Sequence, residues 1–355
     1  MPPPSSSPVD IVYLWVNGND LGWRQKRQRA ALQASVADHG AMALYGNVEG
    51  RFRDNDELRY SLRALERYFP EHGHVYVVTD GQTPVWLRAS SLITVVDHRD
   101  LIPAERLPIF GSGNIESYIH RILGLSERFF YFNDDVFFGA PVQLNDWFWE
   151  HGVYVAWSDD PAVTGAAMQS DATSLENGSR LSKQWLDQDA NALQWVSGYA
   201  HTPRTFAHSP RPLLKSLMYQ LEREAAGLFE AVRSTVFRNW ATPTIVSDFV
   251  LRWALAHGVA RLRDYSHLYV TTGDDDQAAQ LQALRAAHGA LDFFCINDTT
   301  DDAHASDPRL ANARTTLQAM LGSPSRMERD VSSPLTATRD VGGEAVAATP
   351  YLDHA

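Results

Sequence analysis

The sequence predicts an α/β protein in which helices flank a mostly parallel, Rossmann-like sheet. Short apolar runs alternate with amphipathic segments along the first third of the chain, as in successive β-α-β units. The aromatic run 129–132 is too apolar for an exposed edge strand, and it leads directly into Asn133, Asp134 and Asp135. Because open α/β sheets bind ligands at the carboxyl ends of their strands, we expect the functional site here.

The first half of the chain supplies most of the predicted sheet. We expect strands at 9–16, 75–79, 92–96 and 129–132, because each is a short, nearly continuous apolar run bounded by turn residues. Helices are predicted at 21–37, in a segment that opens within 51–63, and at 114–125. These last two helices carry apolar stripes with a period of three to four residues.

The second half repeats the design. Helices are predicted at 212–225, 243–257, 277–288 and 309–321, and strands at 267–271 and 291–296. The last of these strands is again aromatic and leads into Asn297 and Asp298. Two buried strands therefore deliver an Asn and an Asp to their carboxyl ends.

The predicted organisation is one domain. Residues 1–8 read as a flexible N-terminus, 9–322 as the single domain, and the Ser-, Pro- and Ala-rich segment 323–355 as a disordered tail. Periodicity fades between about 141 and 203, where we expect an insertion with little regular structure. Such long insertions often shape the substrate site, so this one is expected to select the acceptor.

Composition excludes several classes of protein. The 355 residues include 31 basic and 43 acidic side chains, a formal net charge of -12, which argues against a nucleic-acid surface. The single cysteine, Cys295, excludes an internal disulfide framework and fits a reducing compartment, so we expect the cytoplasm. The N-terminus lacks the pattern of a signal peptide, and no run of about 18 apolar residues occurs, so membrane contact would be peripheral.

Several polar residues have both a functional and a structural interpretation. Asp134 and Asp135 suit a divalent cation that carries a diphosphate, although Asn-Asp-Asp is also ordinary turn chemistry. Arg59 and Arg63 lie one helical turn apart, where they either bracket a phosphate or pair with surface acids.

Two histidines are ambiguous in the same way. Glu116 and His120 are four residues apart on a predicted helix, and form either an acid/base element beside the aspartates or a hydrogen-bonded pair that orients the helix. His208 taken alone reads as a hydrogen-bonded loop residue.

Seven blocks of sequence closely resemble the Stealth family in their residues and order. They are 10–18, 53–63, 107–110, 115–122, 132–139, 207–210 and 294–298. That family includes bacterial capsular and exopolysaccharide phosphotransferases and the catalytic core of the animal N-acetylglucosamine-1-phosphotransferase. The resemblance implies a GT-A-like domain that transfers a hexose 1-phosphate, such as N-acetylhexosamine 1-phosphate, from a UDP-sugar to a glycan hydroxyl. UMP would be released and a phosphodiester formed, as in capsular or exopolysaccharide synthesis.

The resemblance also implies roles for individual residues. The expected catalytic residues are Glu116, Asp134, Asp135, His208 and Arg238, and the match of His208 and Arg238 in order and separation overrides the structural interpretation of His208. Expected substrate contacts are Asp10, Trp15, Asn17, Gly18, Arg53, Asn55, Arg59, Arg63, His120 and Asn133. Expected ligands of Mg²⁺ or Mn²⁺ are Asp134, Asp135, Asn297 and Asp298. The chain departs from the family pattern at 111–114.

The implied partners are a UDP-sugar donor and a polysaccharide or oligosaccharide acceptor, with no nucleic acid. Capsule assembly in the bacterial relatives takes place at the cytoplasmic face of the inner membrane, so peripheral association with that machinery is implied. Two alternatives stay open. One is a GT-A-type glycosyltransferase that releases UDP, and the other is a non-catalytic glycan-binding protein of the assembly machinery.

Overall fold

The central sheet is mostly parallel, as predicted. A computed structural model describes residues 8–34, 40, 42–43, 46–189, 194–304 and 306–329. Its central sheet has the strand order β3-β2-β1-β4-β8. β1 (Asp10–Leu14), β2 (Val75–Thr79), β3 (Ile93–Asp97) and β4 (Arg128–Asn133) run parallel, and β8 (Arg211–Leu214) is antiparallel to β4. The carboxyl ends of the four parallel strands therefore lie along one edge.

A second sheet meets the first at the Asp134–Asp135 turn. It has the order β10-β11-β5, in which β10 (His267–Thr271) is parallel and β5 (Val136–Phe138) antiparallel to β11 (Phe293–Asn297). The chain leaves β4 in one sheet and enters β5 in the other within two residues. Such a change of sheet opens a crevice at the strand ends, which is where α/β proteins place their sites.

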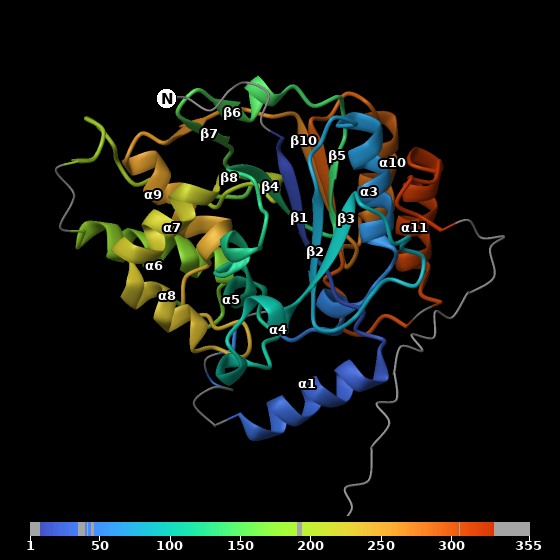
Figure 1. Cartoon of the computed structure of the whole chain (residues 1–355), viewed down its shortest axis with the longest axis horizontal. Coiled ribbons are helices and arrows are strands. Elements are labelled where there is room, and N and C mark those ends of the chain that lie inside the picture. Colours follow the sequence, from blue (N-terminus) through green and yellow to red (C-terminus); the bar gives the residue numbers. More distant parts are fainter. Residues whose placement is uncertain are drawn as a thin grey trace, which may run out of the picture.

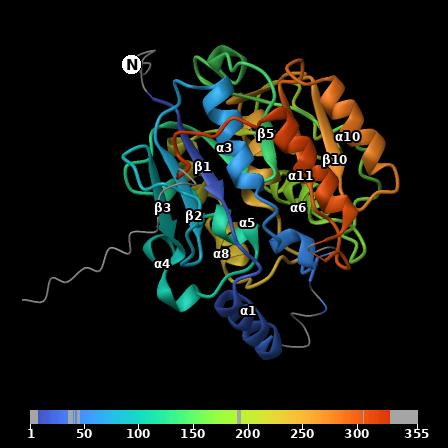
Figure 2. The same cartoon turned by 90° about the vertical axis from the view of Figure 1, so that its right-hand side faces the viewer.

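Helices cover both sides of these strands (Figure 1). One side carries α3 (Glu57–Tyr68), α10 (Gln277–Ala286) and α11 (Pro308–Met320), and Figure 2 shows α10 and α11 together on that face. The other side carries α6 (Ser174–Asp187), α7 (Lys215–Glu224), α8 (Ala226–Arg233) and α9 (Val250–Ala256). α1 (Leu21–Gln33) lies at the bottom of the view, apart from both groups.

Shorter elements complete the chain. They are α4 (His98–Leu101), α5 (Ser112–Glu116), the 3₁₀ turns Glu49–Phe52, Ala104–Arg106, Ile119–Arg121 and Leu144–Asp146, and a π-helical turn at Ile245–Phe249. A small third sheet has the order β6-β7-β9, formed by Phe148–Trp149, Gly152–Val155 and Ala260–Leu262. None of the described helices is long and apolar enough to cross a membrane.

The aromatic strand β4 lies at the centre of the core. Phe129, Phe130, Tyr131 and Phe132 are each at most 1% exposed, which confirms that this run is a buried strand. Phe130 alone makes ring contacts with Phe69, Phe138, Trp147 and Phe148. Edge-to-face packing of this kind adds to the free energy gained by burial, so the turn that follows β4 starts from a rigid base.

The segment 141–203 is more regular than predicted. It contains β6, β7 and the 14-residue helix α6, which begins with a capping box between Thr173 and Glu176. This Thr-x-x-Glu signal is present in the sequence, but the small polar residues around it obscured the apolar period.

The described structure extends past the predicted C-terminal boundary of the domain. The prediction that the disordered tail begins at residue 323 is wrong for its first residues. Met327 and Glu328 are buried, and Arg329 donates hydrogen bonds to the backbone of Trp86 and Leu87. Residues 330–355 and 1–7, and part of the predicted helix 21–37, lie outside the described residues.

Candidate active site

A pocket of about 780 Å³ opens at the junction of the two sheets. It is lined by residues from β4, β11, the segment before β8, α5 and the insertion, so distant parts of the sequence meet there. The predicted site residues that it brings together are Arg53, Glu116, Asn133, Asp134, Asp135, His208, Arg238, Asn297 and Asp298.

Backbone pairing holds the Asp134–Asp135 turn in place. The carbonyl oxygen of Asp135 accepts a 3.1 Å hydrogen bond from the amide of Ile296, and Val136 pairs with Cys295 across the second sheet. The ends of β4 and β11 are thus locked together. The sequence placed an Asn-Asp pair at each of these ends, and the structure makes them neighbours.

Asp134 lies in a group of carboxylates. Burial raises its pKa well above the usual range, and the negative charges of Glu57, Asp135 and Asp54 raise it further. Burial likewise raises the pKa of Glu57 to about 8 and that of Asp54 to about 6. Crowded carboxylates that resist ionisation are stabilised by a cation among them, and their oxygens suit Mg²⁺ or Mn²⁺. The residues present therefore fit the implied metal.

Asp135 is paired differently from Asp134. Its Oδ1 atom lies 3.4 Å from Nε2 of His208, and its Oδ2 atom accepts a 3.4 Å hydrogen bond from the thiol of Cys295. Burial acts to raise the pKa of Asp135, but the charge and contact of His208, together with the thiol, lower it overall. Asp135 is therefore ionised at neutral pH and faces an imidazole across the pocket.

Glu116 and Arg238 form the opposite wall. Burial raises the pKa of Glu116, while Arg238 and the hydroxyl of Tyr131, which donates a 3.0 Å hydrogen bond to Oε1, oppose that shift. The guanidinium of Arg238 donates to the hydroxyl oxygens of Ser112, at 2.7 Å, and Ser174, at 3.3 Å. These neutral partners orient Arg238 without cancelling its charge.

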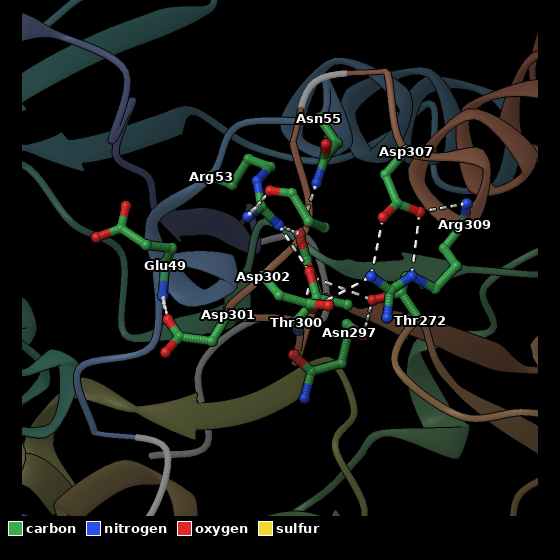
Figure 3. Close-up of polar contacts among 12 residues, drawn as sticks. Glu49, Arg53, Asn55, Thr272, Asn297, Thr300, Asp301, Asp302, Asp307 and Arg309 are labelled. Carbon is green, nitrogen blue, oxygen red and sulfur yellow. Dashed lines mark hydrogen bonds and ion pairs between the residues drawn. The ribbon is translucent and has the colours of Figure 1, made fainter.

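Asp298 has a structural role that the sequence did not predict. Its Oδ1 atom accepts hydrogen bonds from Thr272 and Thr300, and its Oδ2 atom pairs with Arg53, which also donates to Thr300 and Ala303. Figure 3 shows Arg53 and Asn55 converging on this cluster. With hydrogen bonds from protein donors to both of its oxygens, Asp298 anchors Arg53 and Asn55.

Arg59 and Arg63 lie outside the pocket, in contrast to the prediction that they contact phosphate. Both pair with Glu328, whose side chain is 2% exposed, at N–O distances of 2.5 and 2.6 Å. Arg63 also donates to the carbonyl oxygen of Leu321. The structure thus supports the alternative interpretation, pairing with an acid, but the partner is buried and comes from the opposite end of the chain.

His120 is also directed away from the pocket. The predicted helix 114–125 ends at Glu116 and resumes as a 3₁₀ turn, so Glu116 and His120 do not share a helical face. Nε2 of His120 lies 2.8 Å from Glu222, which also pairs with Arg121 and Arg233. Glu116 alone reaches the site.

The predicted contacts in the first family block, residues 10–18, lie in three different places. Asp10 sits at the start of β1, at the opposite end of the sheet, where it accepts hydrogen bonds from the amides of His74 and Ser126. Gly18 fits against Phe52, whose carbonyl oxygen would lie 2.2 Å from an added Cβ, so the glycine is required by close packing.

Trp15 and Asn17 line a second pocket of about 740 Å³ beside the ends of β1, β2 and β3. The amide of Gln82 brackets Asn17 there, accepting from its N–H and donating to its carbonyl oxygen.

Sequence reasoning missed several residues that face the first pocket. They are Arg51, Glu57, Arg211 and Tyr269, and the buried Cys295, also missed, contacts Asp135. Glu57 lies within the matched block 53–63 and Arg51 two residues before it, so a signal was present. Arg211 was hidden because it directly precedes the predicted helix 212–225, where the structure has the strand β8, and Tyr269 because it lies within a plain strand pattern.

Comparison with known proteins identifies the family. Residues 51–156 match Stealth protein conserved region 2, and residues 7–33 match conserved region 1. An exopolysaccharide phosphotransferase of Streptomyces coelicolor is 34% identical over 325 residues, which are 91% of this chain and 52% of that protein. The exopolysaccharide phosphotransferase CpsY of Mycobacterium tuberculosis is 31% identical over 293 residues, 82% of this chain and 52% of CpsY. The chain spans about half the length of these relatives.

Solved structures give only distant likenesses. The galactosyltransferase LgtC, in complex with donor and acceptor sugar analogues, aligns with a TM-score of 0.40 at 10% identity, over 89% of this chain and 96% of LgtC. The bifunctional glycosyltransferase WbbM gives a TM-score of 0.43 at 10% identity, over 91% of this chain and 51% of WbbM. The family assignment comes from the sequence matches: with both conserved regions present and relatives aligned along most of its length, this chain belongs to the Stealth family.

Proposed function

We propose that this protein transfers a sugar 1-phosphate from a UDP-sugar to a hydroxyl of an acceptor glycan and releases UMP. The observation that carries the proposal is the arrangement of His208 and Asp135, 3.4 Å apart, in one pocket with Arg238 and Glu116. A proton acceptor and a cation for phosphoryl oxygens are the two groups that this reaction requires. The names of the relatives, exopolysaccharide phosphotransferases, support the same reaction class.

The reaction breaks one bond to phosphorus and makes another. The acceptor oxygen attacks the phosphorus that bears the sugar, the bond from this phosphorus to the bridging oxygen of the diphosphate breaks, and UMP leaves with that oxygen. The product is a phosphodiester, and the bond between the sugar and its phosphate oxygen stays intact. The hydroxyl proton must go to a base in the pocket.

His208 is best suited to take this proton. Its Nε2 atom faces the Asp135 carboxylate, which leaves Nδ1 free to accept from the acceptor hydroxyl. Asp135 then stabilises the imidazolium that forms. Asp135 is the other ionisable group within reach, but its lowered pKa makes it the weaker base.

Arg238 and Glu116 orient the donor. Arg238 keeps its positive charge beside neutral serines, and it faces the phosphoryl oxygens as their charge is redistributed in the transition state. Glu116 is held by Tyr131 and in turn positions Arg238. Both residues act without a change of protonation.

Asp134 and Asp135 would hold the divalent cation, with Glu57 facing them. When bound, Mg²⁺ or Mn²⁺ would screen the diphosphate charge and assist the departure of UMP. Asn297 and Asp298, at the end of β11 in the same pocket, are the further ligands in this proposal, and Asp298 is also paired with Arg53.

The uridine and the acceptor are assigned to opposite sides of this centre. The second pocket, with Trp15, Asn17 and Gln82, adjoins the end of β4 through the pairing of Leu14 with Asn133, and it would hold the uridine. Residues 158–162 of the insertion and the half-exposed Tyr269 line the other side and would contact the acceptor.

The buried, unpaired Cys295 supports a reducing compartment and hence the cytoplasm. Association with the inner-membrane capsule machinery is part of the same proposal.

The decisive experiment resolves UMP from UDP. The full chain is incubated with a panel of UDP-sugars, Mg²⁺ and a short glycan acceptor, and the released nucleotide is separated by chromatography. UMP that depends on the acceptor and disappears with EDTA is expected. Release of UDP would instead make the protein a glycosyltransferase, and the absence of both products over a broad panel of donors and acceptors would favour a glycan-binding role.

A further inference from the structure

The first pocket contains three arginines that lack an acidic partner. Arg51, Arg211 and Arg238 line it, and among the described residues no carboxylate lies within 4.0 Å of their guanidinium nitrogens. Among buried arginines elsewhere, Arg63 is paired with Glu328 and Arg252 with Asp248, whereas Arg180 donates only to carbonyl and amide oxygens. The arginine cluster, defined as Arg51, Arg211 and Arg238, differs from these arginines because it lines an open pocket that a ligand can enter.

Two members of the cluster, Arg51 and Arg238, are held close enough for their charges to repel. Burial lowers the pKa of Arg51 to about 9, and the positive charge of Arg238 contributes to that shift. Burial lowers the pKa of Arg211 to about 10. Both side chains still carry a positive charge at neutral pH. Desolvated like charges are unfavourable, so this arrangement stores free energy that a bound anion would release.

The fold fixes the positions of the two outer arginines. Arg51 follows Gly50, whose amide donates a hydrogen bond to the carbonyl oxygen of Thr300. If Gly50 were replaced, the added Cβ atom would lie 2.6 Å from the carbonyl oxygens of Asp298 and Thr300. The loop is therefore pressed against the end of the second sheet. The Nε atoms of Arg51 and Arg238 are buried and lack a hydrogen-bond partner. These donors are already in place before a ligand arrives.

Acidic neighbours do not neutralise the cluster. Glu116 attracts all three arginines, but it supplies one charge and burial favours its protonated form. Asp135 also attracts Arg51 and Arg238, but it faces His208 and the proposed cation site. Asp248, which attracts Arg211, is itself paired with Arg252. Guanidinium donors without a carboxylate in contact suit an anion with several oxygens, which is a phosphate group.

We propose that Arg51, Arg211 and Arg238, which line one pocket, form a phosphate subsite that binds the sugar-bearing phosphate of the donor. The inference rests on the proposed function for the source of the phosphate, and it adds Arg51 and Arg211 to the residues that recognise it. The binding itself depends only on the arginine cluster. It is therefore measurable without turnover.

The test measures the binding of inorganic pyrophosphate to the full chain by isothermal titration calorimetry. EDTA is present to remove divalent cations, so that the measured affinity reflects the arginines and not a bound metal. Arg51→Gln is expected to weaken binding by about tenfold or more, and Arg51→Lys by less, because lysine keeps the charge but loses the planar fork. Arg285→Gln, on the exposed side of α10, is the matched control and should bind as the wild type does.

Thermal unfolding separates this role from a structural one. Because Arg51 lies near Arg238 without an acidic partner, Arg51→Gln should leave the melting temperature unchanged or raise it. A folded Arg51→Gln protein that binds pyrophosphate as tightly as the wild type would overturn the subsite. So would a wild-type protein that binds no pyrophosphate.

Steady-state kinetics then show whether the phosphate bound by the arginine cluster belongs to the donor or to the acceptor. In the transfer assay, Arg51→Lys is expected to raise KM for the UDP-sugar, whereas a rise confined to the acceptor KM would contradict the placement. If pyrophosphate binding depends on Arg51 but no UMP is formed with any donor, the proposed function fails and the anion subsite stands.

Discussion

Nε2 of His208 lies 3.4 Å from Oδ1 of Asp135, although one residue precedes β8 and the other follows β4. The antiparallel pairing of β8 with β4 brings the two segments together, and the second sheet fixes the aspartate. A carboxylate that faces an imidazole in this way stabilises the protonated ring. The pair is therefore the centre of the proposed chemistry.

Loss of either member should slow UMP release. We expect His208→Ala and Asp135→Asn each to lower kcat by roughly 10²- to 10⁴-fold, the usual contribution of general acid–base catalysis. Because the two act as a unit, the double variant should be little slower than the slower single variant. His151→Ala, at an exposed position, is the control. Folded single variants with wild-type UMP release would refute the assignment.

Asp134 should determine the response to a divalent cation. Mg²⁺ is expected to raise the melting temperature of the wild-type protein, because binding to the folded state alone adds to its stability. Asp134→Asn should abolish most of that rise while it increases stability in EDTA, since it removes one of the crowded acids. Asp275→Asn, an exposed acid, is the control. An undiminished Mg²⁺ response in Asp134→Asn would place the cation elsewhere.

Arg63 and Glu328 should matter for stability and not for substrate. Removal of one partner from a buried ion pair typically costs about 3–5 kcal/mol, so Arg63→Ala and Glu328→Ala should each lower the free energy of unfolding by about that amount. The double variant should cost much less than the sum. Chemical denaturation measures both. A higher donor KM in a stable Arg63→Lys variant would instead restore the phosphate role predicted from the sequence.

His98 should make the protein sensitive to mild acid. Burial lowers the pKa of His98 from 6.5 to about 4, so between these values the unfolded chain binds the proton that the folded protein excludes. Stability is therefore complete above about pH 6.5 and is lost as pH falls toward 4, by about 3 kcal/mol at most. His98→Gln should flatten this part of the profile, whereas the exposed His151→Gln should not. An unchanged slope in a folded His98→Gln protein would contradict this account.

The sequence by itself determined the sheet and the position of its acids. The apolar runs of β2, β4 and β11 end where predicted to within two residues, because strand formation depends on local pattern and burial. Because ligands bind at the carboxyl ends of strands, Asp134 and Asn297 could each be assigned to the site without coordinates, whereas only the structure showed that their strands belong to two sheets. The family blocks added His208 and Arg238, which local pattern alone would have left as surface residues.

The tertiary structure decided which charged groups meet. Arg63 is paired with Glu328, His120 with Glu222 and Arg53 with Asp298, and none of these partners is near in sequence. A side chain carries its charge in the sequence, but its partner is set by contacts between distant segments, and these depend on the packing of the whole chain. For the same reason only the structure showed that Arg51, Arg211 and Arg238 have no acidic partner among the described residues.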